Sequence, residues 1–134
     1  MSDTQQNKIA SISLPRKAAP LPSAKDQFAA AQEYIQRHAC DGINTEDVLD
    51  YLAEHGMLVS RSTLERRFRK NVGLSPRAAI LDVRIRQARL LLETTDFPIL
   101  KIAELVGVSR PEHFAATFRR VTGILPGQVR RKVR

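Results

Sequence analysis

One short stretch of the chain carries many side chains that can form directional hydrogen bonds with base edges. Arginine can pair bidentately with guanine, while serine, threonine and glutamate can contact other bases. Neighbouring cations bind phosphate and so position such a reading surface. The stretch contains these residue types at Arg61, Ser62, Thr63, Glu65, Arg66 and Arg69. Taken alone, Arg61, Arg66 and Arg69 could form a solvated helix face, but the internal repeat and the net positive charge described below favour contact with double-stranded DNA.

A second group of similar side chains follows about fifty residues later. We interpret His113 as a contact to a DNA base or phosphate rather than as a catalytic group, because no partner suited to catalysis is evident beside it. The second group of candidate DNA-binding residues consists of Ser109, Arg110, Glu112, His113, Arg119 and Arg120.

Both groups belong to an internal repeat. Shifting the chain by fifty residues superimposes apolar, basic, glycine and proline positions together, which is typical of a duplicated structural unit. Each copy has a short amphipathic helix, a tight turn and a second helix with a polar face, which is the helix-turn-helix plan. The matched pairs are Leu64 with Phe114, Phe68 with Phe118, Arg69 and Lys70 with Arg119 and Arg120, Gly73 with Gly123, and Pro76 with Pro126.

Apolar periodicity and helix-ending residues predict the elements that hold these side chains. We expect an all-α fold of about seven helices, with two helix-turn-helix subdomains joined by a long linker helix. The first 25 residues show no sustained apolar period and are predicted to be a flexible tail or linker, followed by a DNA-binding domain over 26–134. Within it we place a first helix to about residue 39, the first helix-turn-helix at about 44–73, the linker helix at about 76–94, the second helix-turn-helix at about 97–123 and a short basic last helix.

Several local details are predicted with these elements. Val72 lies on the apolar side of the first reading helix, and Val121 is predicted to be buried by the second. Ser109 and Glu112 have the spacing of a capping box. Glu65 has three possible roles: a capping partner of Ser62, an ion pair with Arg69 at i+4, or an acceptor for cytosine. Leu64, Phe68, Phe114 and Phe118 are expected to serve the core alone.

Composition supports a polyanionic partner and argues against other classes. The 134 residues include 22 Lys and Arg against 14 Asp and Glu, for a formal charge of +8. Cys40 is the single cysteine, which excludes an internal disulfide and fits a reducing cytoplasm. His38 and Cys40 are more simply a helix end than metal ligands, because no second ligand pair accompanies them. We expect no metal, cofactor or membrane contact, and a cytoplasmic, nucleoid-associated protein that is not an enzyme.

At these residues the chain resembles the DNA-binding domain of the AraC/XylS family of bacterial regulators, over about residues 26–131. Residues 42–68 look most like the regulators of xylose utilisation. The signature is carried by Ile102, Ala103, Val106, Gly107, Ser109, Phe114, Phe118, Gly123, Pro126 and Arg130, and in the linker helix by Arg84, Ile85, Ala88, Arg89, Leu91 and Leu92. The resemblance implies DNA contacts from Ser62, Glu65 and Arg66 in the first unit, and from Arg110, Glu112 and His113 in the second.

The chain departs from the family pattern at two places. Residues 54–59 lengthen the turn of the first unit, and Ala116, beside Ala115, stands where the family has a DNA-contacting arginine. Because of this alanine, the second reading helix is predicted to bind mostly phosphate. The basic run after the second unit could also reach phosphate, or it could serve only as a solubility tail. This run consists of Arg130, Arg131, Lys132 and Arg134.

The resemblance implies a sequence-specific transcription regulator, more often an activator in this family, with double-stranded DNA and RNA polymerase as candidate partners. Family members usually carry an effector-binding sensor, which is not recognisable in the first 25 residues. Two other functions are alternatives: an architectural DNA-binding protein without base discrimination, and a DNA-repair methyltransferase. The methyltransferase is disfavoured because it would need a zinc-bound cysteine cluster.

Overall fold

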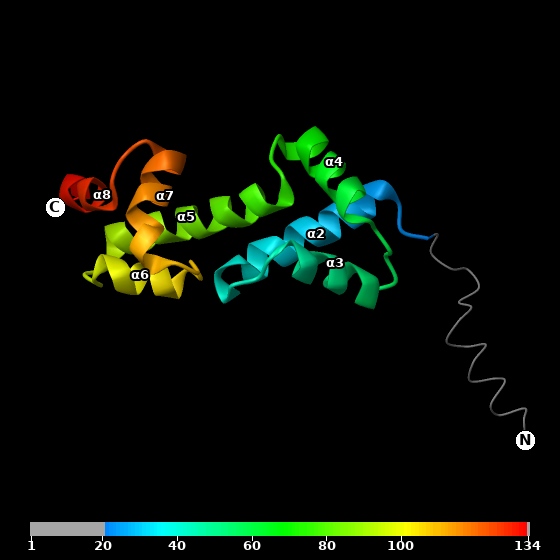
Figure 1. Cartoon of the computed structure of the whole chain (residues 1–134), viewed down its shortest axis with the longest axis horizontal. Coiled ribbons are helices and arrows are strands. Elements are labelled where there is room, and N and C mark those ends of the chain that lie inside the picture. Colours follow the sequence, from blue (N-terminus) through cyan, green and yellow to red (C-terminus); the bar gives the residue numbers. More distant parts are fainter. Residues whose placement is uncertain (1–20, 134) are drawn as a thin grey trace, which may run out of the picture.

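The computed structural model describes residues 21–133, and the regular secondary structure of this part of the chain is helical throughout (Figure 1). It contains seven α-helices and two short 3-10 helices, η1 and η2, which confirms the predicted fold class. Residues 1–20 of the predicted tail lie outside the described residues. The elements are α2 (Ala24–His38), η1 (Ala39–Asp41), α3 (Thr45–Glu54), α4 (Arg61–Val72), α5 (Pro76–Thr94), α6 (Ile99–Leu105), η2 (Pro111–His113), α7 (Phe114–Thr122) and α8 (Pro126–Val133).

Short polar side chains begin the helices of the first half. Ser23 caps α2 in a reciprocal arrangement with Asp26, so this helix begins two residues before the predicted start. Asn44 caps α3 in the same way, Ser60 caps α4, and Ser75 caps α5. Each cap satisfies backbone N–H groups that have no partner within the helix.

The long helix α5 contributes to two separate hydrophobic cores. Ala79 and Ile80, in its first half, pack with α2, α3 and α4. Ile85, Ala88 and Leu92, in its second half, pack with α6, α7 and α8. Figure 1 shows the resulting arrangement, with α5 running between the two units and α4 and α7 rising from the same side of it.

The two units repeat each other in three dimensions. Leu64, Phe68, Phe114 and Phe118 are all completely buried. Gly73 and Gly123 end α4 and α7 in the left-handed conformation, with their N–H groups donating to the carbonyls of Arg69 and Arg119. Together η2 and α7 span residues 111–122, which a shift of fifty residues places on α4 at 61–72.

The predicted capping box of Ser109 and Glu112 is wrong. Arg110 occupies the cap position of η2, which is the equivalent of Ser60 in the first unit, and no side chain caps this end. Arginine has no hydrogen-bond acceptor and cannot cap a helix, while Ser109 lies one residue too early. The second reading element therefore opens with a 3-10 turn, which His113 N closes on Arg110 O at 2.9 Å.

The predicted burial of Val121 is also wrong, because this residue is 39% exposed, and Val72 at the equivalent position is exposed to the same extent. Both residues lie in the last turn of a reading helix. In Figure 1 these turns rise clear of the neighbouring helices, so the apolar stripe continues past the end of the core.

Candidate nucleic-acid interface

The exposed side of α4 presents most of the first predicted set. Ser62, Arg66 and Arg69 are exposed and lie away from the buried side of Leu64 and Phe68. Arg61 is half exposed and forms an ion pair with Glu46 of α3. This ion pair holds the guanidinium at the start of the reading helix, and it was not predicted because the two residues are fifteen positions apart.

Thr63 and Glu65 have more restricted surroundings. Thr63 is partly buried, its backbone N–H donates to the Ser60 side chain, and the Ser60 hydroxyl donates to Thr63 Oγ1 at 2.9 Å. Its hydroxyl is therefore engaged in capping α4. Ser60, rather than Ser62, is the cap, so the predicted capping role of Glu65 is wrong. Glu65 also forms no ion pair with Arg69 among the ion pairs of residues 21–133. Of its three predicted roles, accepting a hydrogen bond from cytosine is the one that this geometry leaves.

The second predicted set lies on the loop before η2, on η2 itself and on α7. Ser109, Arg110, Glu112 and His113 are all exposed. Ala115 and Ala116 face outward too, where the repeat places them on Glu65 and Arg66 of α4. The central part of this second surface thus lacks hydrogen-bonding side chains. Its arginines lie on either side of this central part, at Arg110 before η2 and at Arg119 and Arg120 near the end of α7.

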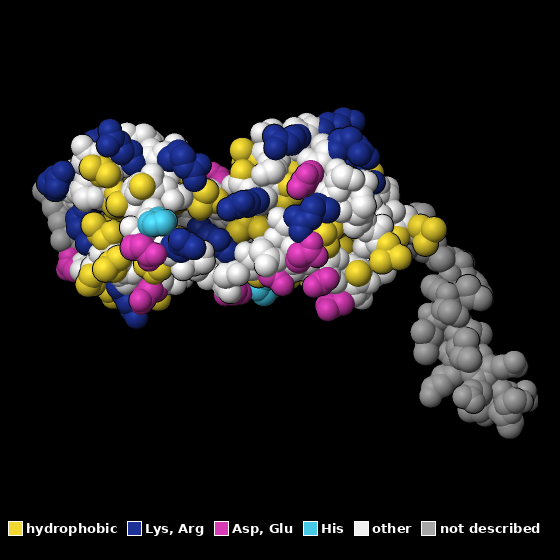
Figure 2. Space-filling model, viewed as in Figure 1, with side chains coloured by type: hydrophobic (Ala, Val, Ile, Leu, Met, Phe, Trp, Pro, Cys, Tyr) yellow, Lys and Arg dark blue, Asp and Glu magenta, His cyan; other side chains and the backbone are white. Residues whose placement is uncertain are grey.

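An open groove lies between the two units and joins the two predicted sets. Figure 2 shows Lys and Arg side chains on both units and along the strip between them, whereas Asp and Glu lie mostly toward the lower edge of this view. Arg77, in the first turn of α5, is a groove residue that our sequence analysis missed. No local sequence pattern marked it, because the groove forms only when segments distant in the sequence pack together. The charged and histidine side chains of the groove are Glu46, Arg61, Arg77, Arg84, Arg110, His113 and Arg120.

Two further arginines bind backbone carbonyls instead of facing solvent. Arg84 Nε donates to Ala39 O at 2.6 Å, and its Nη2 donates to Ile43 O at 2.7 Å. Burial in this position lowers the pKa of Arg84. Arg84 is therefore a structural tie between α5 and the residues at both ends of η1, and it lines the groove.

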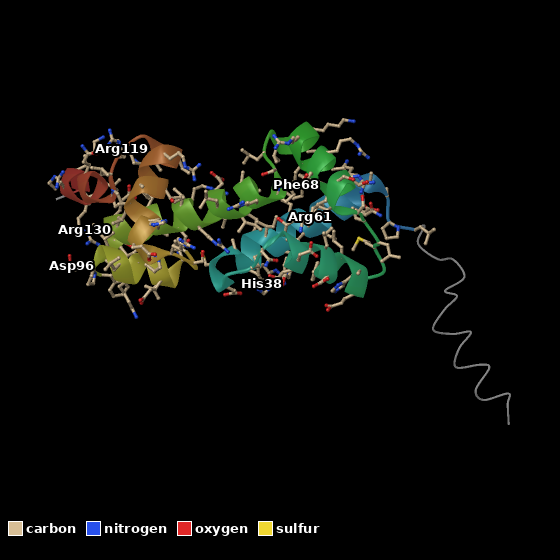
Figure 3. The ribbon with its side chains drawn as sticks, in the orientation of Figure 1. His38, Arg61, Phe68, Asp96, Arg119 and Arg130 are labelled. Carbon is tan, nitrogen blue, oxygen red and sulfur yellow. The ribbon has the colours of Figure 1, made fainter. Side chains whose placement is uncertain are left out.

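Arg130 is also a structural tie, between α8 and the C-terminal end of α5. Its Nη2 donates to Thr95 O at 2.9 Å and its Nε to Leu92 O at 3.4 Å, and Figure 3 places it far from Arg61. Arg130 is therefore neither a phosphate-binding tail residue nor a solubility residue, the two roles predicted for the basic C-terminal run, because its guanidinium binds carbonyls at the end of α5. Arg131 and Lys132 are exposed, and Arg134 lies outside the described residues.

The His38 and Cys40 pair is part of a helix end. His38 Nδ1 lies 2.8 Å from Asp41 Oδ2, and Cys40 is partly buried against the second core. Burial raises the pKa of the Cys40 thiol, which keeps it protonated. No group of three or more potential metal ligands occurs within the described residues. None of the helices there is both long and apolar enough to span a bilayer.

The model of a helix-turn-helix domain family matches residues 55–132, more than half of the chain. The chain therefore belongs to the helix-turn-helix family, and its relatives place it in the AraC/XylS type of sequence-specific DNA-binding domain. This confirms the family resemblance and the prediction of a DNA-binding transcription-regulator domain rather than an enzyme.

Individual relatives support this assignment. The chain is 34% identical over 100 residues to the xylose operon regulatory protein of Escherichia coli K12, an alignment covering 75% of this chain and 24% of that protein. The C-terminal domain of AraT, a response regulator from Geobacillus stearothermophilus, superimposes with a TM-score of 0.71 and 30% identity, covering 84% of this chain and 88% of that domain. The DNA-binding domain of the global transcriptional factor AdpA, solved with a target DNA, gives a TM-score of 0.68 and 29% identity, covering 79% and 91%. The chain thus spans about a quarter of the length of the curated xylose regulator that it matches.

Proposed function

We propose that the chain reads two successive major-groove segments on one face of a DNA duplex, with α4 as the first reading helix and η2 with α7 as the second. The observation that carries the proposal is the placement of α4 and α7 on the same side of α5, with basic side chains exposed on both (Figure 1). An α-helix fits the major groove, and neighbouring cations hold it there through phosphate.

The length of α5 limits how far apart the two readers can be. Its 19 residues extend about 28 Å at 1.5 Å per residue. Successive major-groove segments on one face of straight DNA are about 34 Å apart. We therefore expect the duplex to bend toward the protein by a modest amount when both readers are seated.

The two readers are expected to contribute unequally to base discrimination. The first offers Arg61, Ser62, Glu65 and Arg66, and we propose these as the main base contacts. The second presents Ala115 and Ala116 at its centre, so Arg110, Arg119 and Arg120 are proposed to bind mainly phosphate, with Glu112 and His113 as weaker readers. Thr63 and Arg69 are assigned to positioning α4.

Selection from a randomised duplex pool tests this directly. Two enriched half-sites about one turn apart, bound on the order of a thousand times more tightly than scrambled DNA, would support a two-headed reader. Anisotropy over a salt series is needed alongside, because phosphate contacts make every affinity salt-dependent. Uniform binding of all sequences, lost together as salt rises, would instead favour an architectural protein.

Paired variants separate the proposed roles. Arg66→Ala should cost about 1–3 kcal/mol on the selected site and relax specificity at one position of the first half-site. Arg120→Ala should weaken all sequences alike and reduce the salt slope by about one. Arg37→Ala is a matched control, because this exposed arginine on α2 pairs with Glu33 and does not line the groove. Base changes in the second half-site that cost as much as those in the first would overturn the proposed inequality.

At the level of the whole protein, we propose a transcription regulator that acts in the cytoplasm on the nucleoid, as an activator that contacts RNA polymerase. An effector-binding sensor is proposed to accompany this domain. The support is the shared domain with the xylose operon regulatory protein, of which this chain covers about a quarter. Reporter transcription from a promoter carrying the selected site, with and without the chain, would establish the sign of regulation.

A further inference from the structure

The groove between the two units contains several arginines that have no hydrogen-bond or ion-pair partner within residues 21–133. Three of its arginines, Arg77, Arg110 and Arg120, are exposed and form no hydrogen bond or ion pair within residues 21–133. They come from α5, from the loop before η2 and from α7. Glu46 is the one carboxylate in the described lining, and its charge is paired with Arg61. This excess of positive charge suits a polyanion.

The position of the groove indicates which part of a duplex would face it. The groove is lined by residues 42–46 of the first unit, the first half of α5, and residues 107–120 of the second unit, so it lies between the two readers. If α4 and α7 occupy successive major-groove segments on one face, the groove that faces the protein between them is the minor groove. This step rests on the proposed function.

The type of cation in the groove indicates which DNA sequences it would favour. Every cation that lines the described groove is an arginine, and none is a lysine. Arginine is less strongly hydrated than lysine and enters a narrow minor groove more readily. A·T-rich segments have narrow minor grooves with enhanced negative potential, which attract such side chains. Of these arginines, Arg77 alone combines exposure with a place on the linker helix itself.

We propose that the groove between the two units binds the minor groove of the DNA spacer, that Arg77 contacts it directly, and that the domain therefore prefers A·T-rich spacers. Arg110 and Arg120, both of the second unit, bind the phosphates beside this contact. The spacer is thus recognised by its shape and by the absence of the guanine amino group, although neither reading helix contacts its base pairs.

A spacer library with both half-sites held constant tests the proposal. The wild-type chain should enrich A·T pairs in the spacer, and it should bind an all-A·T spacer several-fold more tightly than an all-G·C spacer. Inosine·cytosine pairs have the major-groove pattern of G·C but lack its minor-groove amino group. An inosine·cytosine spacer should therefore behave like the A·T spacer.

Arg77→Lys is the decisive variant, because it keeps the charge and removes the guanidinium. We expect it to lose the spacer preference while it keeps the discrimination between the selected half-sites and scrambled half-sites. Arg86→Lys is the matched control, since Arg86 is an exposed arginine on the same helix that pairs with Asp82 and does not line the groove. Thermal melts of both variants check that the fold is unchanged.

Three results would overturn the inference. They are equal binding to all spacers, inosine·cytosine behaving like G·C, or an unchanged A·T preference in Arg77→Lys. All three leave the half-site enrichment intact, so they differ from a failure of the two-headed reader, in which no half-sites are enriched at all.

Discussion

Replacing Gly107 by alanine probes the contact that holds the two units together. Gly107 follows α6 with φ +82°, a left-handed conformation that side chains disfavour. A Cβ atom there would lie 2.7 Å from Cys40 O, 2.9 Å from Cys40 C and 3.0 Å from Gly42 N. The contacted atoms are backbone of the first unit, which cannot swing aside as a flexible side chain would.

The expected loss of stability has two parts. The left-handed conformation costs a non-glycine residue about 1–2 kcal/mol. Forcing a methyl group into a filled space adds about 1–3 kcal/mol. Together these lower the free energy of unfolding by about 2–5 kcal/mol, a large share of the roughly 5–15 kcal/mol typical of a domain. For a domain of this size, each 1 kcal/mol lowers Tm by about 4 °C, so we expect a decrease of about 8–20 °C.

Gly123→Ala is the matched control for this experiment. Its φ is +87°, close to that of Gly107, but a Cβ atom would meet nothing within 4 Å. It should therefore lose only the conformational part, about 1–2 kcal/mol or about 4–8 °C. Thermal melts followed by circular dichroism compare the two variants with the wild type. Equal losses in both would refute the close approach of Gly107 to Cys40.

Three other changes test separate parts of the structure. Arg84→Met removes two hydrogen bonds to backbone carbonyls and should destabilise the domain by about 2–4 kcal/mol in urea denaturation, whereas a cost near zero would contradict the tie. Phe118→Ala empties a fully buried position and should cost about 3–5 kcal/mol, measured in the same way. Iodoacetamide should label Cys40 at higher pH in the folded chain than in the urea-unfolded chain, because burial raises its pKa. The sign also predicts that the stability contributed by the neutral thiol is present below the unfolded pKa and decreases as pH rises through the folded pKa.

The helices and their repeat were predictable because their signals are local. Asn44, Ser60 and Ser75 are short acceptors placed just before apolar periods, and each of them caps a helix. The shift of fifty residues predicted the equivalent burial of Phe68 and Phe118, since the same spacing of apolar residues produces the same packing. Errors occurred at helix ends, where the position of a single residue decides whether a cap forms.

The interface was predictable only in part, because its geometry depends on residues distant in sequence. The exposed face of α4 follows from helical periodicity, but the ion pair of Arg61 with Glu46 depends on how α3 packs beside α4. Arg130 has the appearance of a phosphate-binding tail residue and instead binds Thr95 O. Arg77 becomes a groove residue through the packing of segments more than thirty residues apart, which no local pattern reports.

The same packing makes the spacing of the two readers a property of the core. Ile80 belongs to the first core and Ile85 to the second, and Arg84 between them ties α5 to the residues on both sides of η1. Gly107 closes the junction from the other side. Sliding or rotating one unit against the other would break buried contacts on a single continuous helix.

If both units read DNA, the duplex must therefore adapt to the spacing that the protein sets. One extra base pair in the spacer turns the second half-site by about 35°. Twisting or bending of the DNA has to absorb that change. Base sequence in the spacer then affects affinity through its deformability as well as through any contact of Arg77.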